Sequence, residues 1–263
     1  MCKKLIYLIS VMVLALFLTS SAYAASIVWV TETSDDDANG AQDDQGFIDL
    51  LMAEGHCVNV QPDNWKELED DPGKLAELNA ADLVIVSRTI GSGNYDDGNE
   101  PAMWNSVTSP MILMSGYLHR TNRWSWMNNS EFVNADEILM ATDASHPVFD
   151  GVELIDGAMV LAYDNTVSGG CVTFAGTTDV GNGTLIAQGA GGDYTAIAEW
   201  EAGVEMFPGG AIAGGPRMLF IAGSWEKDCA DVATVGPQGG YNLLPDGKKM
   251  FLNAISYMAS AGQ

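Results

Sequence analysis

Residues that suit ligand binding gather between positions 81 and 126, after two short apolar runs. The runs, Leu83–Val86 and Met111–Met114, have the composition of strands buried on both faces. The segments after them combine planar rings with carboxylate, amide and guanidinium groups. Rings of this kind cover the apolar faces of sugars, while the polar groups pair with hydroxyls. This pattern favours a small-ligand site, carbohydrate first, made by Arg88, Asn94, Tyr95, Asp96, Tyr117, His119, Arg120, Arg123, Trp124 and Trp126.

The same residue types also have a structural explanation. The arginines can pair with acidic loops, and the two tryptophans of the W-x-W sequence can pack in a core. Both alternatives remain open at the level of sequence.

A serine hydrolase is a second way to read these residues. Ser115 follows the second apolar run, and His119 or His146 could act as its base with Asp143 orienting the histidine. A histidine four residues beyond the serine is poorly placed unless the loop folds back. Alternatively, Ser115 caps a turn and His146 structures a His-Pro turn.

An acidic loop near the start of the chain resembles half of a calcium site. Asp35, Asp37, Asn39 and Gly40 match the first half of an EF-hand loop, whose oxygens alternate toward the ion. Position twelve is Gly46 instead of the required glutamate. Calcium is therefore a candidate cofactor only if other carboxylates complete the site, and the loop can equally be a solvated acidic segment. The two carboxylates that could substitute are Asp43 and Asp44.

The charge balance excludes some partners. The chain has a net charge of −24, which repels nucleic acid and anionic membranes because phosphate binding needs clustered Lys and Arg. Cations and neutral ligands remain compatible with this charge.

Residues 1–24 have the organisation of a signal peptide. Lys3 and Lys4 precede the apolar run Leu5–Leu18, and Ala22-Tyr23-Ala24 is a cleavage signal. The run is short for a membrane span, although an uncleaved anchor is the alternative. We therefore expect a single domain at residues 25–263, secreted or periplasmic, that does not insert into a membrane after cleavage.

Export permits a disulfide among the cysteines that remain after cleavage. The pairing cannot be read from sequence, but Cys171–Cys229 is favoured because both lie in the loop-rich second half. Cys57 begins a predicted strand and is expected to be a buried small hydrophobe.

Strands and helices alternate in the first half of the chain. This alternation predicts a parallel sheet. The first predicted helix has Asp43 or Asp44 as its N-cap and Gly55 at its C-terminal end. The second half instead has short apolar runs between glycines, which predict additional β-strands. The expected strands are Ile27–Val30, Cys57–Val60, Leu83–Val86 and Met111–Met114, then Met159–Ala162, Cys171–Ala175, Thr184–Ala187, Thr195–Glu199 and Met218–Ile221, before a final helix from about Gly247.

Five motifs, in order, resemble the class I glutamine amidotransferase-like superfamily. They are most similar to its ThuA-like branch in secreted bacterial proteins. The motifs are Ala81–Ser87, Pro110–Ser115, Ser145–Val152, Ile197–Gly203 and Leu252–Ile255. The resemblance implies an α/β fold: a three-layer, flavodoxin-like parallel sheet with additional β-strands in the second half.

The resemblance also bears on activity. Ser115 stands where the amidotransferases have their catalytic cysteine, and no histidine follows His146. The amidotransferase Cys-His dyad is therefore absent. We expect a non-catalytic ThuA-like domain that binds a carbohydrate or related small ligand at the carboxyl edge of the sheet. The alternatives are an extracellular hydrolase of glycans or esters that uses Ser115, and a calcium-stabilised surface or assembly protein.

Overall fold

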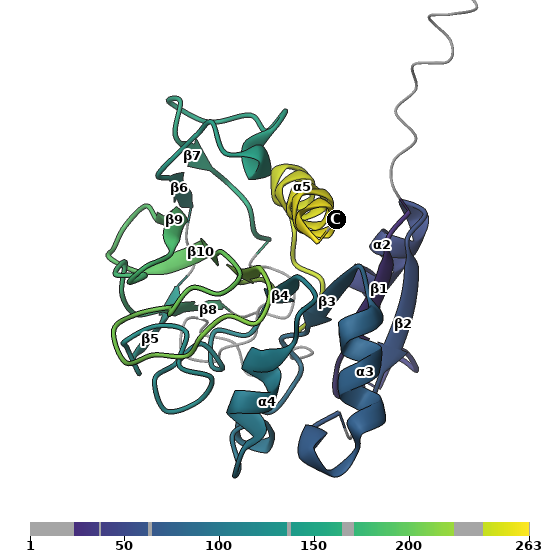
Figure 1. Cartoon of the computed structure of the whole chain (residues 1–263). Coiled ribbons are helices and arrows are strands. Elements are labelled where there is room, and N and C mark those ends of the chain that lie inside the picture. Colours follow the sequence, from purple (N-terminus) through teal and green to yellow (C-terminus); the bar gives the residue numbers. More distant parts are fainter. Residues whose placement is uncertain are drawn as a thin grey trace, which may run out of the picture.

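The computed structural model describes residues 24–36, 38–62, 65–135, 138–164, 171–223 and 239–262. In this part of the chain the strands form one eleven-stranded sheet with helices packed on it (Figure 1). Three predictions lie wholly or partly outside the described residues: the signal peptide, Asp37 of the calcium loop and Cys229 of the disulfide. Among the described residues, no helix has the length and apolarity needed to cross a membrane.

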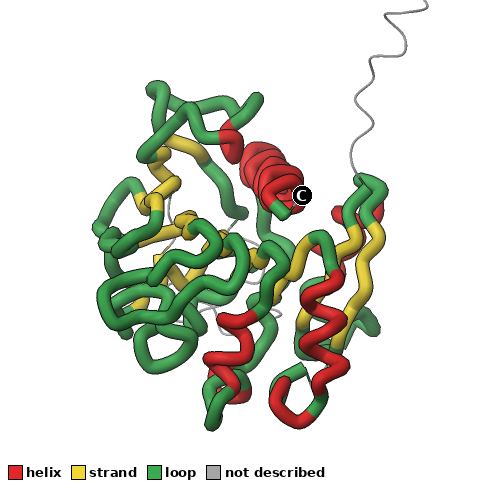
Figure 2. The backbone as a smooth tube through the Cα atoms, in the orientation of Figure 1, coloured by secondary structure: helices red, strands yellow, loops and turns green. Residues whose placement is uncertain are grey.

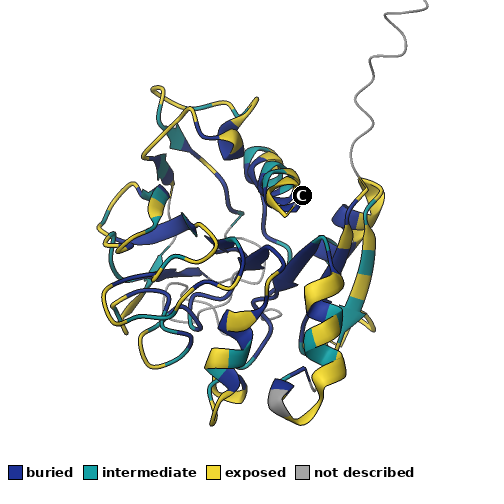
Figure 3. Ribbon diagram, viewed as in Figure 1, coloured by how far each residue is buried: buried dark blue, intermediate teal, exposed yellow. Residues whose placement is uncertain are grey.

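One half of the sheet is parallel, as the alternation of strands and helices predicts. Its strands lie in the order β2-β1-β3-β4-β11, and each neighbouring pair is parallel. Every residue of β3 and β4 is buried (Figure 3), as expected for central strands that are covered on both faces. The bounds are β1 Ser26–Val30, β2 Cys57–Gln61, β3 Leu83–Val86, β4 Met111–Leu113 and β11 Arg217–Phe220.

The other half of the sheet is antiparallel. β10 joins it to β11, and the order continues β10-β9-β6-β7, while β8 pairs with both β10 and β5. Long loops connect β6 to β7 and β10 to β11 (Figure 2). The predicted additional β-strands of the second half are thereby confirmed. Their bounds are β5 Phe132–Ala135, β6 Leu139–Ala141, β7 Met159–Val160, β8 Val172–Ala175, β9 Thr184–Gly189 and β10 Thr195–Trp200.

Helices lie on both sides of the sheet; in Figure 1, α5 and α4 are on opposite sides. Phe47 of α2 contacts Phe251 of α5, with ring centroids 5.5 Å apart. The buried side of α5 includes Met250, Phe251, Ala254, Ile255 and Met258. The α-helices are α2 Gln45–Ala53, α3 Pro72–Ala80, α4 Glu100–Ser106 and α5 Pro245–Ala261, and the 3₁₀ helices are η1 Leu68–Asp70, η2 Ser92–Asn94 and η3 Pro147–Phe149.

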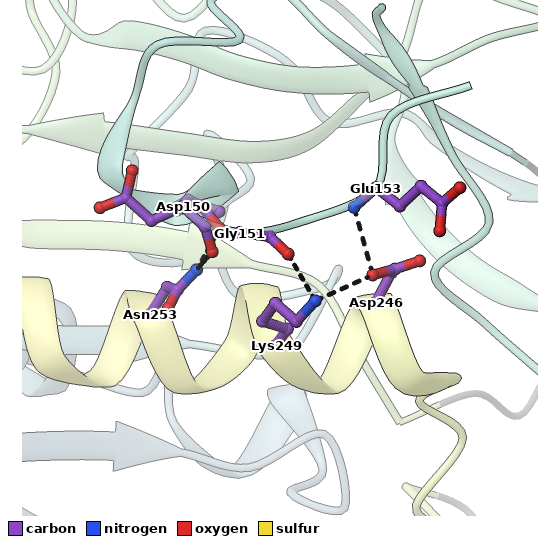
Figure 4. Close-up of polar contacts among 7 residues, drawn as sticks. Asp150, Gly151, Glu153, Asp246, Lys249 and Asn253 are labelled. Carbon is purple, nitrogen blue, oxygen red and sulfur yellow. Dashed lines mark hydrogen bonds and ion pairs between the residues drawn. The ribbon is translucent and has the colours of Figure 1, made fainter. Parts of the chain in front are cut away.

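The His-Pro segment around η3 is attached to α5 by side chains of the helix (Figure 4). Asn253 Nδ2 donates hydrogen bonds to the carbonyls of Val148 and Asp150, at 3.0 and 2.9 Å. Lys249 Nζ donates to the carbonyl of Gly151. The polar face of α5 thus supplies donors to carbonyls of a turn that would otherwise lack partners.

The position of Cys57 corrects one prediction. Its side chain is free and exposed instead of buried, because β2 is the last strand at its end of the sheet and has a neighbour on one side only. Cys171 is disulfide-bonded, while its predicted partner Cys229 lies outside the described residues.

Candidate functional site

The carboxyl ends of β1 and β3 meet at one edge of the sheet. Thr31 directly follows β1, and Thr89 lies three residues beyond β3. Their hydroxyl oxygens are 2.7 Å apart and share a hydrogen bond, and the backbone N–H of Glu32 donates to Thr89 Oγ1 at 3.2 Å. Ligands of open α/β sheets bind at such an edge, outside the carboxyl ends of the strands.

Asp44 joins three elements beneath this edge. Its carboxylate is fully buried and accepts hydrogen bonds from Trp29 Nε1 at 2.8 Å, Thr31 Oγ1 at 2.8 Å and Ser87 Oγ at 2.5 Å. Gln42 Nε2 donates to its other oxygen at 2.6 Å. Four donors can satisfy a buried carboxylate. The side chain therefore ties β1 and β3 to the start of α2.

The role of Asp44 differs from both roles that the sequence suggested. It does occupy the N-cap position of α2, but its side chain makes no capping hydrogen bond. Its oxygens serve the strands, so it is not oriented toward a calcium ion in the preceding loop.

The other described residues of the predicted calcium loop bind within the loop. The Asp35 carboxylate accepts from the backbone N–H groups of Asn39 and Gly40, at 2.8 and 2.9 Å. Asn39 Oδ1 accepts from the N–H of Ala41 at 2.8 Å, and Asp43 accepts from Ser34 Oγ. Within the described residues, which omit Asp37, no group of three or more His, Cys, Asp or Glu side chains is arranged to hold a metal. Calcium binding stays a prediction.

Three predicted ligand-binding residues form a stack after β3 and β4. The Arg88 guanidinium carbon lies 4.8 Å from the centre of the Tyr117 ring, and that of Arg120 lies 5.4 Å from it. Arg120 Nε also donates to the Tyr117 carbonyl at 2.8 Å. Burial, and next the positive charge of Arg123, lower the pKa of Arg120. Two cations thus share one half-buried aromatic ring in an otherwise acidic protein.

Other charged and polar residues of the predicted site pair with each other. Arg123 forms an ion pair with Asp96. Asn94 Nδ2 donates to Glu32 Oε1 at 2.9 Å, which brings the loop after β3 to the loop after β1. The sequence left open that the arginines pair with acidic loops, and these contacts match that alternative. They also hold the loops at this edge of the sheet together.

The two tryptophans of the W-x-W sequence lie in the interior of the protein. Trp124 and Trp126 are both fully buried. Their ring nitrogens donate to the Tyr95 carbonyl and to Asn105 Oδ1, at 2.9 and 2.8 Å. Both rings belong to the core, which matches the packing alternative that the sequence left open, and contact with a ligand stays a prediction. They stand in a chain of aromatic contacts that runs Tyr95, Trp104, Trp124, Trp126 and Trp200.

The predicted catalytic residues occupy separate environments. Ser115 is fully buried, and its Oγ accepts from the backbone N–H of Tyr117 at 3.3 Å. His119 is also fully buried, and burial followed by the positive charge of Arg120 lowers its pKa to about 3, against the opposing effect of the Gly116 backbone. Its ring is therefore uncharged at neutral pH.

His146 and Asp143 lie in the η3 turn. His146 Nδ1 accepts from the backbone N–H of Val148 at 3.2 Å, so this side chain caps the turn. Asp143 is exposed and accepts from the Ser145 backbone and hydroxyl, at 2.9 and 2.6 Å. In the described part of the chain, no hydrogen bond links Ser115 to either residue.

Sequence reasoning missed the cluster of buried hydroxyl side chains at this edge of the sheet. Thr31, Ser87 and Thr89 are buried and connect directly to one another or to Asp44. The available signal was their position within three residues of the end of a buried strand. Neither the comparison with protein-family models nor the search of the curated proteins finds a match for this chain.

Proposed function

We propose that the chain is an exported, non-catalytic ThuA-like domain that binds a carbohydrate or a related small ligand at the carboxyl edge of its sheet. The observation that carries the proposal is the stack of Arg88, Tyr117 and Arg120. A half-buried ring beside guanidinium groups matches the mixed surface of a sugar, whose C–H faces pack on rings and whose hydroxyls accept from cations.

The strand order supports the location of this site. The order β2-β1-β3-β4-β11, with all pairs parallel, is the order of a flavodoxin-like core, and we propose that assignment. In such a core the direction in which successive strands are added to the sheet reverses between β1 and β3. Ligands bind in the crevice at that point. Thr31, Glu32 and Thr89 lie there.

A glycan array probed with the chain that lacks residues 1–24 tests the proposal. We expect a defined set of glycans to be retained, and we expect Tyr117→Ala to lose them because the stacking surface is removed. Arg120→Lys keeps the charge but loses the planar group, so it should weaken binding less than Arg120→Ala. No retained glycan, or retention that Tyr117→Ala leaves unchanged, would contradict carbohydrate binding at this edge.

The hydrolase alternative requires Ser115 to become accessible to the substrate. Its side chain is fully buried, so attack on a glycan or ester requires the loop after β4 to open. If the retained glycan is cleaved and Ser115→Ala abolishes cleavage without abolishing retention, the hydrolase replaces the binding domain. Cleavage that survives Ser115→Ala excludes the serine mechanism.

A further inference from the structure

A second pocket lies at the opposite edge of the sheet. It has a volume of about 650 Å³ and is bounded by the end of β10, the start of β11 and the last two turns of α5. β10 runs antiparallel to β11, so the carboxyl end of β10 lies at the amino edge of the parallel strands. The pocket is therefore distinct from the edge that carries Arg88 and Tyr117.

Two carboxylates at the end of β10 line this pocket: Glu199 belongs to the strand and Glu201 directly follows it. Glu199 and Glu201 both belong to its wall, and alternate residues of an extended segment point to the same side. The ring of the intervening Trp200 meets that of Trp126 at a centroid distance of 5.8 Å. Both glutamates raise the pKa of Tyr257 on α5, although burial is the larger cause. Both carboxylates are therefore directed toward α5.

Two neighbouring side chains lie close to Glu199. His146 Nδ1 accepts a hydrogen bond from Val148, so the hydrogen of the neutral ring is on Nε2. That Nε2 lies 3.4 Å from Glu199 Oε1, and it has no hydrogen-bond partner among the described residues. The Tyr257 hydroxyl forms a hydrogen bond with Glu199. The ring of Tyr257 also packs edge-on against His146 at 5.0 Å.

The two carboxylates outnumber the one arginine that lines the pocket. Neither Glu199 nor Glu201 forms an ion pair there with Lys or Arg. Arg217 lines the same pocket, but its Nη1 and Nη2 donate to the carbonyls of Ser109 and Asn105, each at 3.1 Å. Its guanidinium is thus bound to the end of α4. Because these carbonyls are neutral, the guanidinium keeps its charge and offsets one of the two carboxylates. The pocket therefore keeps a net negative charge, which the net charge of −24 reinforces.

Part of the wall is apolar and could accept a short carbon chain. Ala202, Val204 and Met258 contribute this surface. We propose that this pocket binds a small organic cation, a protonated amine whose ammonium group meets Glu199 and Glu201 and whose carbon chain packs on these apolar residues. This proposal does not depend on carbohydrate binding at the other edge.

Titration with 1,4-diaminobutane, followed by heteronuclear NMR at constant ionic strength, tests the proposal. We expect saturable shifts at Glu199, Glu201 and Tyr257, and no such shifts with the uncharged 1,4-butanediol, which has a similar length. Glu201→Gln should weaken binding about tenfold. Because Glu201 is exposed, this variant is expected to fold normally. Tyr257→Phe keeps the ring but frees Glu199 from its hydroxyl partner, and should weaken binding several-fold.

The matched control is Glu153→Gln. It removes one negative charge from an exposed side chain beside α5 (Figure 4), outside the pocket, and should leave binding unchanged. The proposal is overturned if Glu201→Gln and Glu153→Gln behave alike, or if the diol binds as well as the diamine. It is also overturned if the diamine produces no saturable shifts at about 10 mM, a concentration that should detect even a weak ion pair.

Discussion

The guanidinium of Arg88, from the loop after β3, lies over the ring of Tyr117, from the loop after β4, at 4.8 Å from its centroid. Arg88 is only 3% exposed, so the attraction between cation and ring acts where little water screens it. This contact fixes the two loops to each other and presents the remaining surface of the ring at the carboxyl edge.

Tyr117→Leu should destabilise the protein because the ring supplies the attraction for two guanidinium groups. We expect the free energy of unfolding, measured in denaturant, to fall by about 1–3 kcal/mol. Tyr117→Phe keeps the aromatic face and should lose clearly less. Equal losses for the two variants would show that the ring face does not stabilise the loops.

The sequence predicts the parallel strands well because buried strands leave a local signal. The run Leu83–Val86 is apolar and mostly β-branched, and β3 has the same bounds. The direction of side chains outside strands leaves no such signal. Trp124 and Trp126 alternate as they would in a strand, but Ser125 between them has a φ of 57°, which redirects the chain so that both rings enter the core.

The partners of Asp44 are a second feature that could not be predicted from the sequence. Asp44 stands at the start of a helix, where capping is the usual role of its carboxylate. Its actual partners, Trp29 and Ser87, come from two strands, 15 and 43 residues away in sequence. Such partners are known only when the sheet has been assembled.

Asp44→Ala should be among the most destabilising single substitutions in this protein. It leaves Trp29 and Ser87 as buried donors without their acceptor, and each such donor costs about 1–3 kcal/mol, while Thr31 keeps its hydrogen bond with Thr89. We expect unfolding free energy to fall by about 3–5 kcal/mol. Asp49→Ala, on the exposed side of the same helix, is the control and should change stability by less than about 0.5 kcal/mol. Similar effects of the two substitutions would contradict a joining role for Asp44.

Gly116→Ala tests how closely the loop after β4 approaches β8. A Cβ at this position would lie 2.0 Å from the Thr173 backbone oxygen, and a strand carbonyl cannot move aside without loss of pairing. We expect a loss of at least about 1–3 kcal/mol of unfolding free energy, as for other overpacked sites. Gly93→Ala is the control, because no atom lies within 4 Å of its added Cβ. A Gly116→Ala protein as stable as Gly93→Ala would mean that the loop is not held against β8.

The lowered pKa of His119 leads us to expect a specific dependence of stability on pH. In the folded protein its pKa is lowered to about 3, whereas in the unfolded chain it returns to about 6.5. Below pH 6.5 the unfolded state therefore binds a proton that the folded state excludes. The stability contributed by neutral His119 is complete above pH 6.5 and is lost as the pH falls toward 3, at about 1.4 kcal/mol per pH unit.

A variant that cannot titrate at this position isolates the effect. Between pH 7 and pH 5 the wild type should lose about 2 kcal/mol more unfolding free energy than His119→Leu, whatever the absolute stability of the variant. His56→Gln serves for comparison. The pKa of His56 is also lowered by burial, but Glu54 opposes the shift. Removing His56 should therefore change the pH dependence of the unfolding free energy less than removing His119 does. Parallel pH profiles for the wild type and His119→Leu would show that His119 can be protonated in the folded protein. The loop after β4 would then be open to water, and the accessibility that a Ser115 mechanism requires would be regained.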